Sequence, residues 1–550
     1  MDPVELTPAN TNPWYVLMTL EGEQNGEDVD RELAKRNSKL WNAWICQEMS
    51  KDERSSFPLA FDIGRPESDW NPVLAEKIKS LFQKRYRHLK ELPEMPHPSD
   101  PIDLSYTEFS RPLVLEFGLF REISFDGSVF CGAFDISNSI FDGYTSFISG
   151  WFRGTAYIRG GKFRKVVRFG KASFSRSANF DDCDFDKRAH FNNIETEGAI
   201  SFVDAKFRGD AEFIGSNFDG TVNFLEAQFL SGSSFRHAKF KRSTSLHDVM
   251  FVERSNFSGA HFGGNTSFDG ASFKADADFQ KITADGLVTF KGKSKLFSTR
   301  PPAHFGTKTL FSESHFKGRV DFYQRRFGPY DEPAAAVTFA NAILEQPVSF
   351  EDATFPHVMP VSSNTTLPAS TKVTAEDSHW PKLPSPFNWI TGRTSFRKHQ
   401  DHAKVKEAAG ALRHAMARQM LPEEEHFFFR REMFAGARCG PWFQGLITRL
   451  FFELPSNYGY SIERPAALLG VVWAIGALLY WCFADFTKGA AASYSFSAMF
   501  KFFGFQRTFF WPETQALAPA MQTVAATQTV LAFILLFFLG LGLRTRFRLR

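Results

Sequence analysis

The feature that most constrains this chain is a phenylalanine that recurs at alternating steps of five and six residues. In the stretch SNFDGTVNFLEAQFLSGSSFRHAKF, residues 216–240, Phe stands at 218, 224, 229, 235 and 240. The same phase runs unbroken from Phe125 to Phe279, and 25 of its 29 positions are Phe; the others are Ile136, Ile158, Thr196 and Leu246. A helix face recurs every three or four residues and a strand face every two, so neither element alone explains the spacing.

Two alternating steps add up to an eleven-residue period, which also occurs in right-handed supercoils of helices. The residues between the aromatics are Gly, Asp, Asn, Ser and basic residues, however, and the first four favour turns over helix interiors. We therefore predict a solenoid in which each step forms one short extended side and a corner. The Phe points inward, and so does the small residue two positions earlier, because side chains alternate along a strand.

Four such sides close one coil of 22 residues, so side chains 22 positions apart are predicted to stack. Phe218 then lies over Thr196 and under Phe240, whereas a strict five-residue rule would place it beside Ala238. We interpret these aromatics as core, not as a ligand site. The positions assigned to the core ladder are Phe174, Phe180, Phe185, Phe191, Phe202, Phe207, Phe213, Phe218, Phe224, Phe229, Phe235, Phe240, Phe251 and Phe257.

The units ANF at 178–180, AEF at 211–213, AKF at 238–240 and ADF at 277–279 resemble the pentapeptide-repeat family. That family repeats A-(D/N)-(L/F)-x-x, and the resemblance, over roughly residues 104–355, implies a mostly β fold, a right-handed quadrilateral β-helix. The extra residue on every second side departs from the family pattern and predicts two wider, bulged corners in each coil. The phase falters after Phe279 and resumes at Phe311, which predicts an excursion or a distorted coil.

The flanks predict other structures. Residues 1–103 contain two helical patterns, 29–49 and 71–89, and we expect a helical cap over the open solenoid end. Residues 356–390 are rich in Pro, Ser and Thr and predict a linker. Residues 391–440 predict a connector of two helices, with Pro422 at the start of the second.

Residues 441–550 predict a membrane domain. The apolar spacing in 442–454 favours a helix lying in the membrane interface, with a buried soluble helix as the alternative. Two uncharged stretches near 465–484 and 522–543 are long enough to span a bilayer and predict an α-helical transmembrane hairpin.

Basic residues predict the orientation of this hairpin. Six lie at the outer ends of the two spans, and the loop between them holds three: Lys488, Lys501 and Arg507. The positive-inside rule then places both termini in the cytoplasm. The residues that we assign as topology anchors are Arg464, Pro465, Trp481, Arg544, Arg546, Arg548 and Arg550.

The last ~125 residues are similar to the membrane-anchored branch of bacterial pentapeptide-repeat proteins, through the motifs FF-R-E, Y-G-x-S-x-x-R-P and L-R-x-R-F-R-L. The matching residues are Phe428, Phe429, Arg431, Glu432, Tyr458, Gly459, Ser461, Arg464, Pro465, Leu543, Arg544, Arg546, Phe547, Arg548 and Leu549. This resemblance implies a multi-pass protein of the bacterial inner membrane and no enzymatic activity.

No catalytic or cofactor motif stands in a credible context, so we expect no enzyme, no cofactor and no metal. His399 and His402 lack a third ligand, and the acidic run DDCDFD, residues 181–186, reads as an exposed corner. The five cysteines are scattered, which favours a reducing compartment.

The leading functional hypothesis is a membrane-tethered scaffold whose partners are the lipid bilayer and an unidentified protein on the solenoid. The alternative is an oligomeric two-span channel gated through the solenoid, a homo-oligomer in which 493–512 re-enters the membrane; we favour an interfacial placement of that segment. Nucleic-acid mimicry is disfavoured, because residues 125–279 hold 19 acidic and 18 basic residues.

Overall fold

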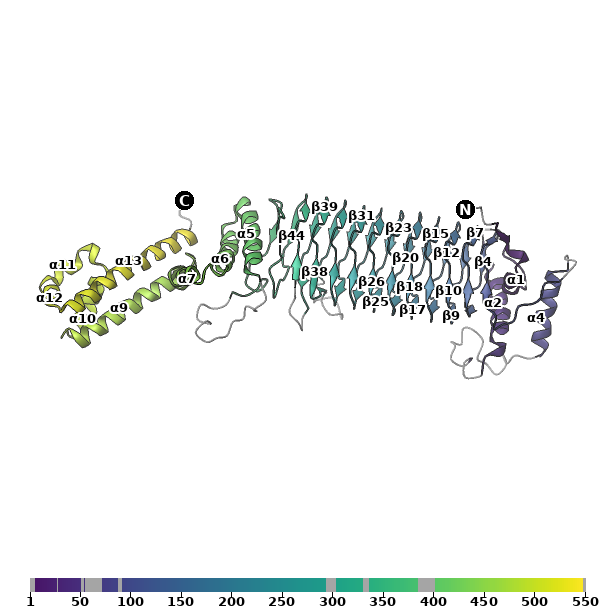
Figure 1. Cartoon of the computed structure of the whole chain (residues 1–550), viewed down its shortest axis with the longest axis horizontal. Helices are drawn as coiled ribbons and strands as arrows, with labels where there is room; N and C mark the ends of the chain where they lie inside the picture. Colours follow the sequence, from purple (N-terminus) through teal and green to yellow (C-terminus); the bar gives the residue numbers. More distant parts are fainter. Residues whose placement is uncertain are drawn as a thin grey trace. The chain divides into compact units, whose positions relative to one another are not determined.

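The computed structural model describes residues 5–26, 28–50, 54, 72–87, 92–292, 303–329, 336–383 and 401–547. The chain divides into two compact units, Met1–Pro381 and Lys382–Arg550 (Figure 1). The first unit is a β-solenoid with helices at its N-terminal end, and the second consists of helices. Each unit is described by itself.

The solenoid has four sides, each a sheet of short strands of two or three residues that all pair in parallel (Figure 1). Two sheets have twelve strands, from β1 (Thr7–Pro8) to β43 (Ile343–Leu344) and from β4 (Leu113–Val114) to β45 (Lys372–Val373). A third has eleven strands, from β2 (Ile102–Asp103) to β42 (Ala336–Thr338). The fourth has eight, from β5 (Leu119–Phe120) to β33 (Ser272–Phe273), and the pair β37 (His304–Phe305) and β41 (Arg326–Phe327) follows on that side.

The predicted 22-residue register is confirmed. Strand β23 (Asn217–Phe218) pairs with β19 (Glu195–Thr196) so that Thr196 faces Phe218, and with β27 (Lys239–Phe240) so that Phe218 faces Phe240. The rings of Phe229 and Phe251 stack with centroids 5.0 Å apart, close to the spacing of neighbouring strands. Every Phe assigned to the ladder is at most 1% exposed, so the column of rings is the core.

Alternate corners of the coil differ in backbone conformation. Non-glycine residues with positive φ recur every eleven residues, as at Lys171, Asp182, Asn193 and Asp204, with φ of 60°, 58°, 56° and 55°. Each lies on a five-residue step and closes a tight turn; around Asp182, for example, the amide of Cys183 donates to the carbonyl of Phe180 at 3.3 Å. The two kinds of corner therefore differ, with left-handed residues on the short steps, and the wider, bulged corners expected on the long steps stay a prediction.

The solenoid continues past Phe279 through two coils longer than 22 residues. Phe290 stays in phase, stacking on Phe268 at 4.8 Å. Phe305 then stacks on Phe273 at 5.2 Å, although 32 residues separate them, and Phe339 stacks on Phe311, 28 residues earlier, at 4.9 Å. The ten and six extra residues match 293–302 and 330–335, which lie outside the described residues. The interrupted phase is thus explained by longer coils, and whether the extra residues form an excursion or a distorted coil stays a prediction.

Aromatic side chains close the N-terminal end of the column. Helices α1 (Pro13–Met18), α2 (Arg31–Ile45) and α4 (Pro72–Arg85) and the short turns η1 (Ala9–Thr11) and η2 (Cys46–Glu48) precede the coils. Trp41 Nε1 donates to the carbonyl of Leu119 at 2.9 Å, and its ring lies 5.8 Å from that of Phe120. Tyr15 likewise packs on Phe109 at 5.6 Å. These contacts cover the first rings of the solenoid column, Phe109 and Phe120, which is the role expected of an N-terminal helical cap.

The C-terminal end of the column lies inside the segment that the sequence assigned to a linker. Strand β45 pairs with β44 (Val348–Phe350), and Val361 pairs with Thr338, so a last coil follows Phe355. Trp380 stacks on Phe355 at 4.8 Å. The expected linker therefore begins later than residue 356, and its remaining part from 384 lies outside the described residues. Proline suits this coil, because few strands remain to pair with it.

The second unit begins with the antiparallel pair α5 (His402–Arg418) and α6 (Pro422–Cys439), joined by an ion pair between Arg413 Nε and Glu432 Oε2 at 2.6 Å. Several elements follow in order: α7 (Trp442–Thr448), the π-helix η5 (Arg449–Glu453), α8 (Leu454–Ser456), α9 (Glu463–Phe483), α10 (Lys488–Met499), η6 (Lys501–Phe503), α11 (Phe505–Phe509), α12 (Trp511–Ala516) and α13 (Pro519–Phe547). The long helices α9 and α13 coincide with the two predicted spans.

Candidate functional site

Several outer charges of the solenoid are paired between neighbouring coils. Arg188 contacts Asp210 at 3.0 Å, and Lys241 contacts Asp219 at 2.7 Å, each across one 22-residue coil. Arg208 bridges both Asp184 at 2.9 Å and Asp186 at 3.2 Å. These pairs leave alternating charges on the surface and do not form a one-signed array.

One face of the solenoid is small and uncharged over several coils. It lies on the sheet that runs from β16 (Ala178–Asn179) to β32 (Thr266–Ser267), where the second residue of each strand points outward. These outward residues are Asn179, Ser201, Asn223, Ser245 and Ser267, all partly exposed. The face is regular because every coil repeats the same backbone.

The acidic run at 181–186 is held by internal contacts. Asp182 occupies a left-handed corner and pairs with Arg159 at 3.1 Å, and Asp181 accepts from the amide of Val203 at 2.8 Å. The buried Cys183 thiol donates to the carbonyl of Ile158 at 3.1 Å, and burial raises its pKa. In the part of the chain that the structure describes, no group of three His, Cys, Asp or Glu residues has the geometry of a metal site.

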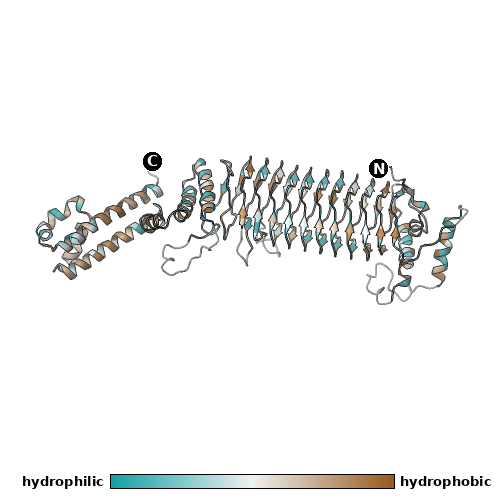
Figure 2. Cartoon of the chain, viewed as in Figure 1, coloured by the Kyte–Doolittle hydropathy of each residue, from teal (hydrophilic) through white to brown (hydrophobic). Residues whose placement is uncertain are grey.

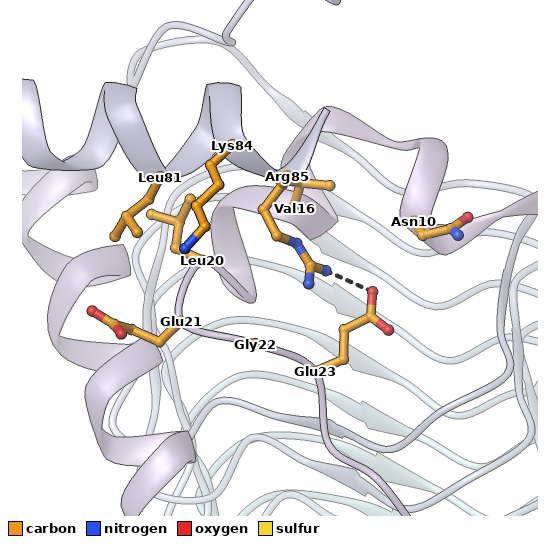
Figure 3. A pocket seen from close by; sticks show the side chains of 9 residues that line it. All are labelled: Asn10, Val16, Leu20, Glu21, Gly22, Glu23, Leu81, Lys84 and Arg85. Atoms are coloured by element: carbon orange, nitrogen blue, oxygen red, sulfur yellow. Dashed lines mark hydrogen bonds and ion pairs between the residues drawn. The ribbon is translucent and has the colours of Figure 1, made fainter. Parts of the chain in front are cut away.

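A polar cleft of about 500 Å³ opens in the N-terminal cap, between the 20–23 segment and α4 (Figure 3). Its acidic residues are both paired: Glu23 with Arg85 at 2.7 Å and with Arg111 at 3.1 Å, and Glu21 with Lys77 at 3.2 Å. The pairs with Arg85 and Lys77 join α4 to the 20–23 segment, so we assign these charges to holding the cap together and not to binding a ligand.

In the second unit, α9 and α13 are long and apolar enough to cross a membrane, as their colouring in Figure 2 shows. Only 11% of the apolar window in α9 and 28% of that in α13 is buried, so most of this surface faces outward. Of the predicted anchors, Pro465 is buried, while Trp481 is 45% exposed and lies under the Lys488 ammonium at 5.0 Å.

The remaining anchors are basic. Arg464 Nη1 donates to the carbonyl of Glu453 at 3.2 Å, and Arg544 is exposed near the end of α13. Arg548 and Arg550 lie outside the described residues, and so does the side chain of Arg546. Their role in orientation stays a prediction.

Helix α10 turns back alongside α9. Trp473 Nε1 donates to the carbonyl of Ala492 at 3.0 Å, and Ser495 Oγ donates to the carbonyl of Trp473 at 2.8 Å. Trp473 lies ten residues before the end of α9, or ~15 Å along its axis. These bonds hold α10 against the middle of α9, and the interfacial placement of 493–512 stays a prediction.

A buried polar network ties α10 to both long helices. Gln528 on α13 accepts from the Tyr480 hydroxyl at 2.9 Å and donates to Ser495 Oγ at 2.9 Å and to the carbonyl of Val472 at 3.0 Å. A Cβ on Gly476 would collide with the Gln528 amide, so glycine allows this approach. Sequence reasoning missed the network, although a glutamine inside an apolar stretch was an available signal.

Four parallel sheets with a 22-residue coil and an inward Phe ladder define a quadrilateral β-solenoid. The family model described as pentapeptide repeats (9 copies) matches residues 202–250, which lie within these coils. The chain thus carries a pentapeptide-repeat solenoid, followed by two apolar helices. Comparisons with curated proteins and with solved structures return no match.

Proposed function

We propose that this protein is a membrane-tethered scaffold that presents its solenoid to a protein partner at the cytoplasmic face of a bacterial inner membrane. In this proposal α9 and α13 span the bilayer, both termini are cytoplasmic, and the protein catalyses no reaction. The observation that carries the proposal is the pairing, in one chain, of a repeat solenoid with two outward-facing apolar helices.

Two further observations support it. The interior of the solenoid is filled by stacked rings, so its use lies on its surface, where coils repeat flat faces of a kind that proteins bind. The apolar surface of α9 and α13 would be costly in water and is stable against lipid tails.

Photo-crosslinking in the living cell tests the scaffold role. A photoreactive amino acid is placed at one outward position on each of the four faces: Ser245, Ser234, Lys239 and Gln228. Crosslinks to another protein from one or two faces, but not from all four, are the expected result. No crosslink from any face, or equal nonspecific crosslinks from all, would contradict the proposal.

A second candidate, an oligomeric channel, is favoured by α10. Two spans with a short helix that returns between them resemble the outline of channels with a re-entrant pore helix. The loop beyond α10 forms a cleft of about 240 Å³ that Lys501, Arg507 and Trp511 help to line. Planar-bilayer conductance that disappears when 493–512 is scrambled, in protein that still inserts, would place this candidate above the scaffold.

A further inference from the structure

An exposed apolar stripe runs along α7 and η5. Phe443, Leu446, Ile447, Leu450 and Phe451 follow helical spacing and are each 45–51% exposed. Such spacing normally marks the face that a soluble helix buries. Here a continuous apolar surface stays open, and surfaces of this kind mark contacts with proteins or membranes.

The stripe lies beside one end of the hairpin. The ring of Phe452 meets that of Phe538 on α13 at 5.7 Å. A Cβ on Gly459 would lie 2.8 Å from Leu541, so the backbone at 459 rests against the same helix. Because α9 begins at Glu463 and α13 ends at Phe547, the stripe stands at the end where the chain enters and leaves the hairpin.

Cationic side chains accompany the stripe. Arg438, at the end of α6, has its guanidinium 3.3 Å from the centroid of the Phe434 ring. Burial, and next the neighbouring Arg449, lower the pKa of Arg438 to about 10, so the two guanidinium groups act on each other as like charges. Arg449 Nε is buried and, within the described residues, makes no hydrogen bond.

The carboxylate close to these arginines is already engaged. Glu453 is buried, and its Oε2 accepts from the Tyr458 hydroxyl at 3.3 Å, while Arg464 bonds the backbone carbonyl of Glu453. Among the described residues, the charges that act on Arg438 are those of Arg449 and of the Glu453 carboxylate, whereas Arg464 reaches only the backbone of Glu453. This junction holds excess positive charge beside an apolar surface.

We infer that this junction binds the phosphate of an anionic phospholipid, with the arginines on the headgroup and the stripe among the acyl chains. The inference rests on the proposed membrane tethering and adds a lipid partner to it. Guanidinium groups suit phosphate because they donate paired, charge-assisted hydrogen bonds. A free phosphate would use the arginines but leave the stripe uncovered, and an acidic protein segment would not cover five large apolar side chains; a lipid satisfies both.

Native mass spectrometry of the detergent-solubilised full chain tests the inference. The protein is titrated with phosphatidylglycerol, with phosphatidylcholine and with inorganic phosphate. The double variant R438Q/R449Q removes two headgroup contacts, and K501Q/R507Q removes the same charge from the loop between the spans. We expect phosphatidylglycerol to bind R438Q/R449Q about 30-fold more weakly than the parent, since each basic residue near an anionic headgroup is worth ~1 kcal/mol. K501Q/R507Q should bind like the parent.

The inference would be overturned if R438Q/R449Q bound phosphatidylglycerol as tightly as the parent, or if K501Q/R507Q lost as much affinity as R438Q/R449Q. It would also be overturned if the parent bound phosphatidylcholine as tightly as phosphatidylglycerol. If inorganic phosphate displaced the lipid at matched concentration, the bound phosphate group would not need to come from a lipid, and the lipid assignment would be wrong. Membrane fractionation of the parent chain tests the proposed tethering separately. If the parent chain is found in the membrane, a negative lipid-binding result contradicts only the inference about the phospholipid. If thermal melting shows that the double variant is unfolded, the single variant R449Q replaces it, with an expected loss of about fivefold.

Discussion

The ring of Phe218 stacks on the ring of Phe240 with centroids 5.0 Å apart and planes 10° apart. The two residues are 22 positions apart in the chain and are direct partners in neighbouring parallel strands. The same relationship recurs along the solenoid, so its stability depends on inward positions that are each flanked by two others. Substitutions at single rungs test this dependence.

Replacing Phe229 by Asp should abolish folding of the solenoid. Phe229 is 1% exposed and stacks on Phe207 at 4.7 Å and on Phe251 at 5.0 Å. The change removes ~2–3 kcal/mol of apolar burial and places an unpaired carboxylate in the core, at a cost of several kcal/mol more. Circular dichroism and limited proteolysis of the full chain would show this loss. The neighbouring outward substitution Gln228→Asp should leave both unchanged; equal behaviour of the two variants would contradict the model of the coil.

Thr196 is the weak rung between Phe174 and Phe218. Its hydroxyl is buried and, in the described part of the chain, has no hydrogen-bond partner. Thr196→Val should raise the free energy of unfolding by ~1 kcal/mol, because an unsatisfied hydroxyl disappears while the shape is kept. Thr196→Phe should gain more by restoring the stack. Chemical denaturation measures both changes, and a loss of stability in the Val variant would show that the hydroxyl is satisfied after all.

Gly220 should not tolerate a side chain. A Cβ there would collide with the carbonyl oxygen of Gly198, one coil earlier, whereas a Cβ on Gly170 would have its closest neighbour, the carbonyl oxygen of Asn192, at 3.8 Å. Gly220→Ala should therefore cost ~1–3 kcal/mol, and Gly170→Ala should stay within ~0.5 kcal/mol of the parent. Thermal melts of the two alanine variants compare them directly. Indistinguishable melting temperatures would argue against close stacking of these corners.

Arg325 is a fully buried cation in the Phe column. Its guanidinium lies 4.3 Å from the Phe305 ring centroid, and none of its nitrogens forms a hydrogen bond within the described residues. Burial lowers its pKa to about 9, from an ordinary value of 12.5. A base with a depressed pKa weakens the fold while it is charged, so the native state gains stability as the pH rises through 9.

Arg325→Met should consequently stabilise the solenoid at pH 7 by ~1–4 kcal/mol, since an apolar residue of similar length needs no counterion. The advantage over the parent should shrink above pH 9, where the parent arginine loses its charge. Urea titrations of both proteins at pH 7 and at pH 10 measure the difference. A destabilised variant at pH 7 would mean that the ring contact outweighs the desolvation of the charge.

The sequence was sufficient to predict the ladder and its register because each coil repeats the same inward step. The corners were harder: Asp182 and Asn193 lie on the short steps, and nothing in the spacing distinguishes a left-handed residue from a bulge on the next side. The last coil was missed because Val361 and Leu367 replace Phe there among prolines. The membrane unit lacks any repeat, so the contacts of Gln528 with Tyr480 and Ser495 follow from packing of distant helices and not from local pattern.

The central claim is that a transmembrane hairpin with both ends in the cytoplasm tethers a cytosolic solenoid. Reporter fusions to the full chain test this claim most directly. A reporter that is active only on the far side of the membrane is fused after Arg550 or inserted near Gly489, in the first turn of α10. We predict that the fusion after Arg550 is inactive and that the insertion near Gly489 is active. The reverse pattern, or a chain that fractionates away from the membrane, would contradict the claim.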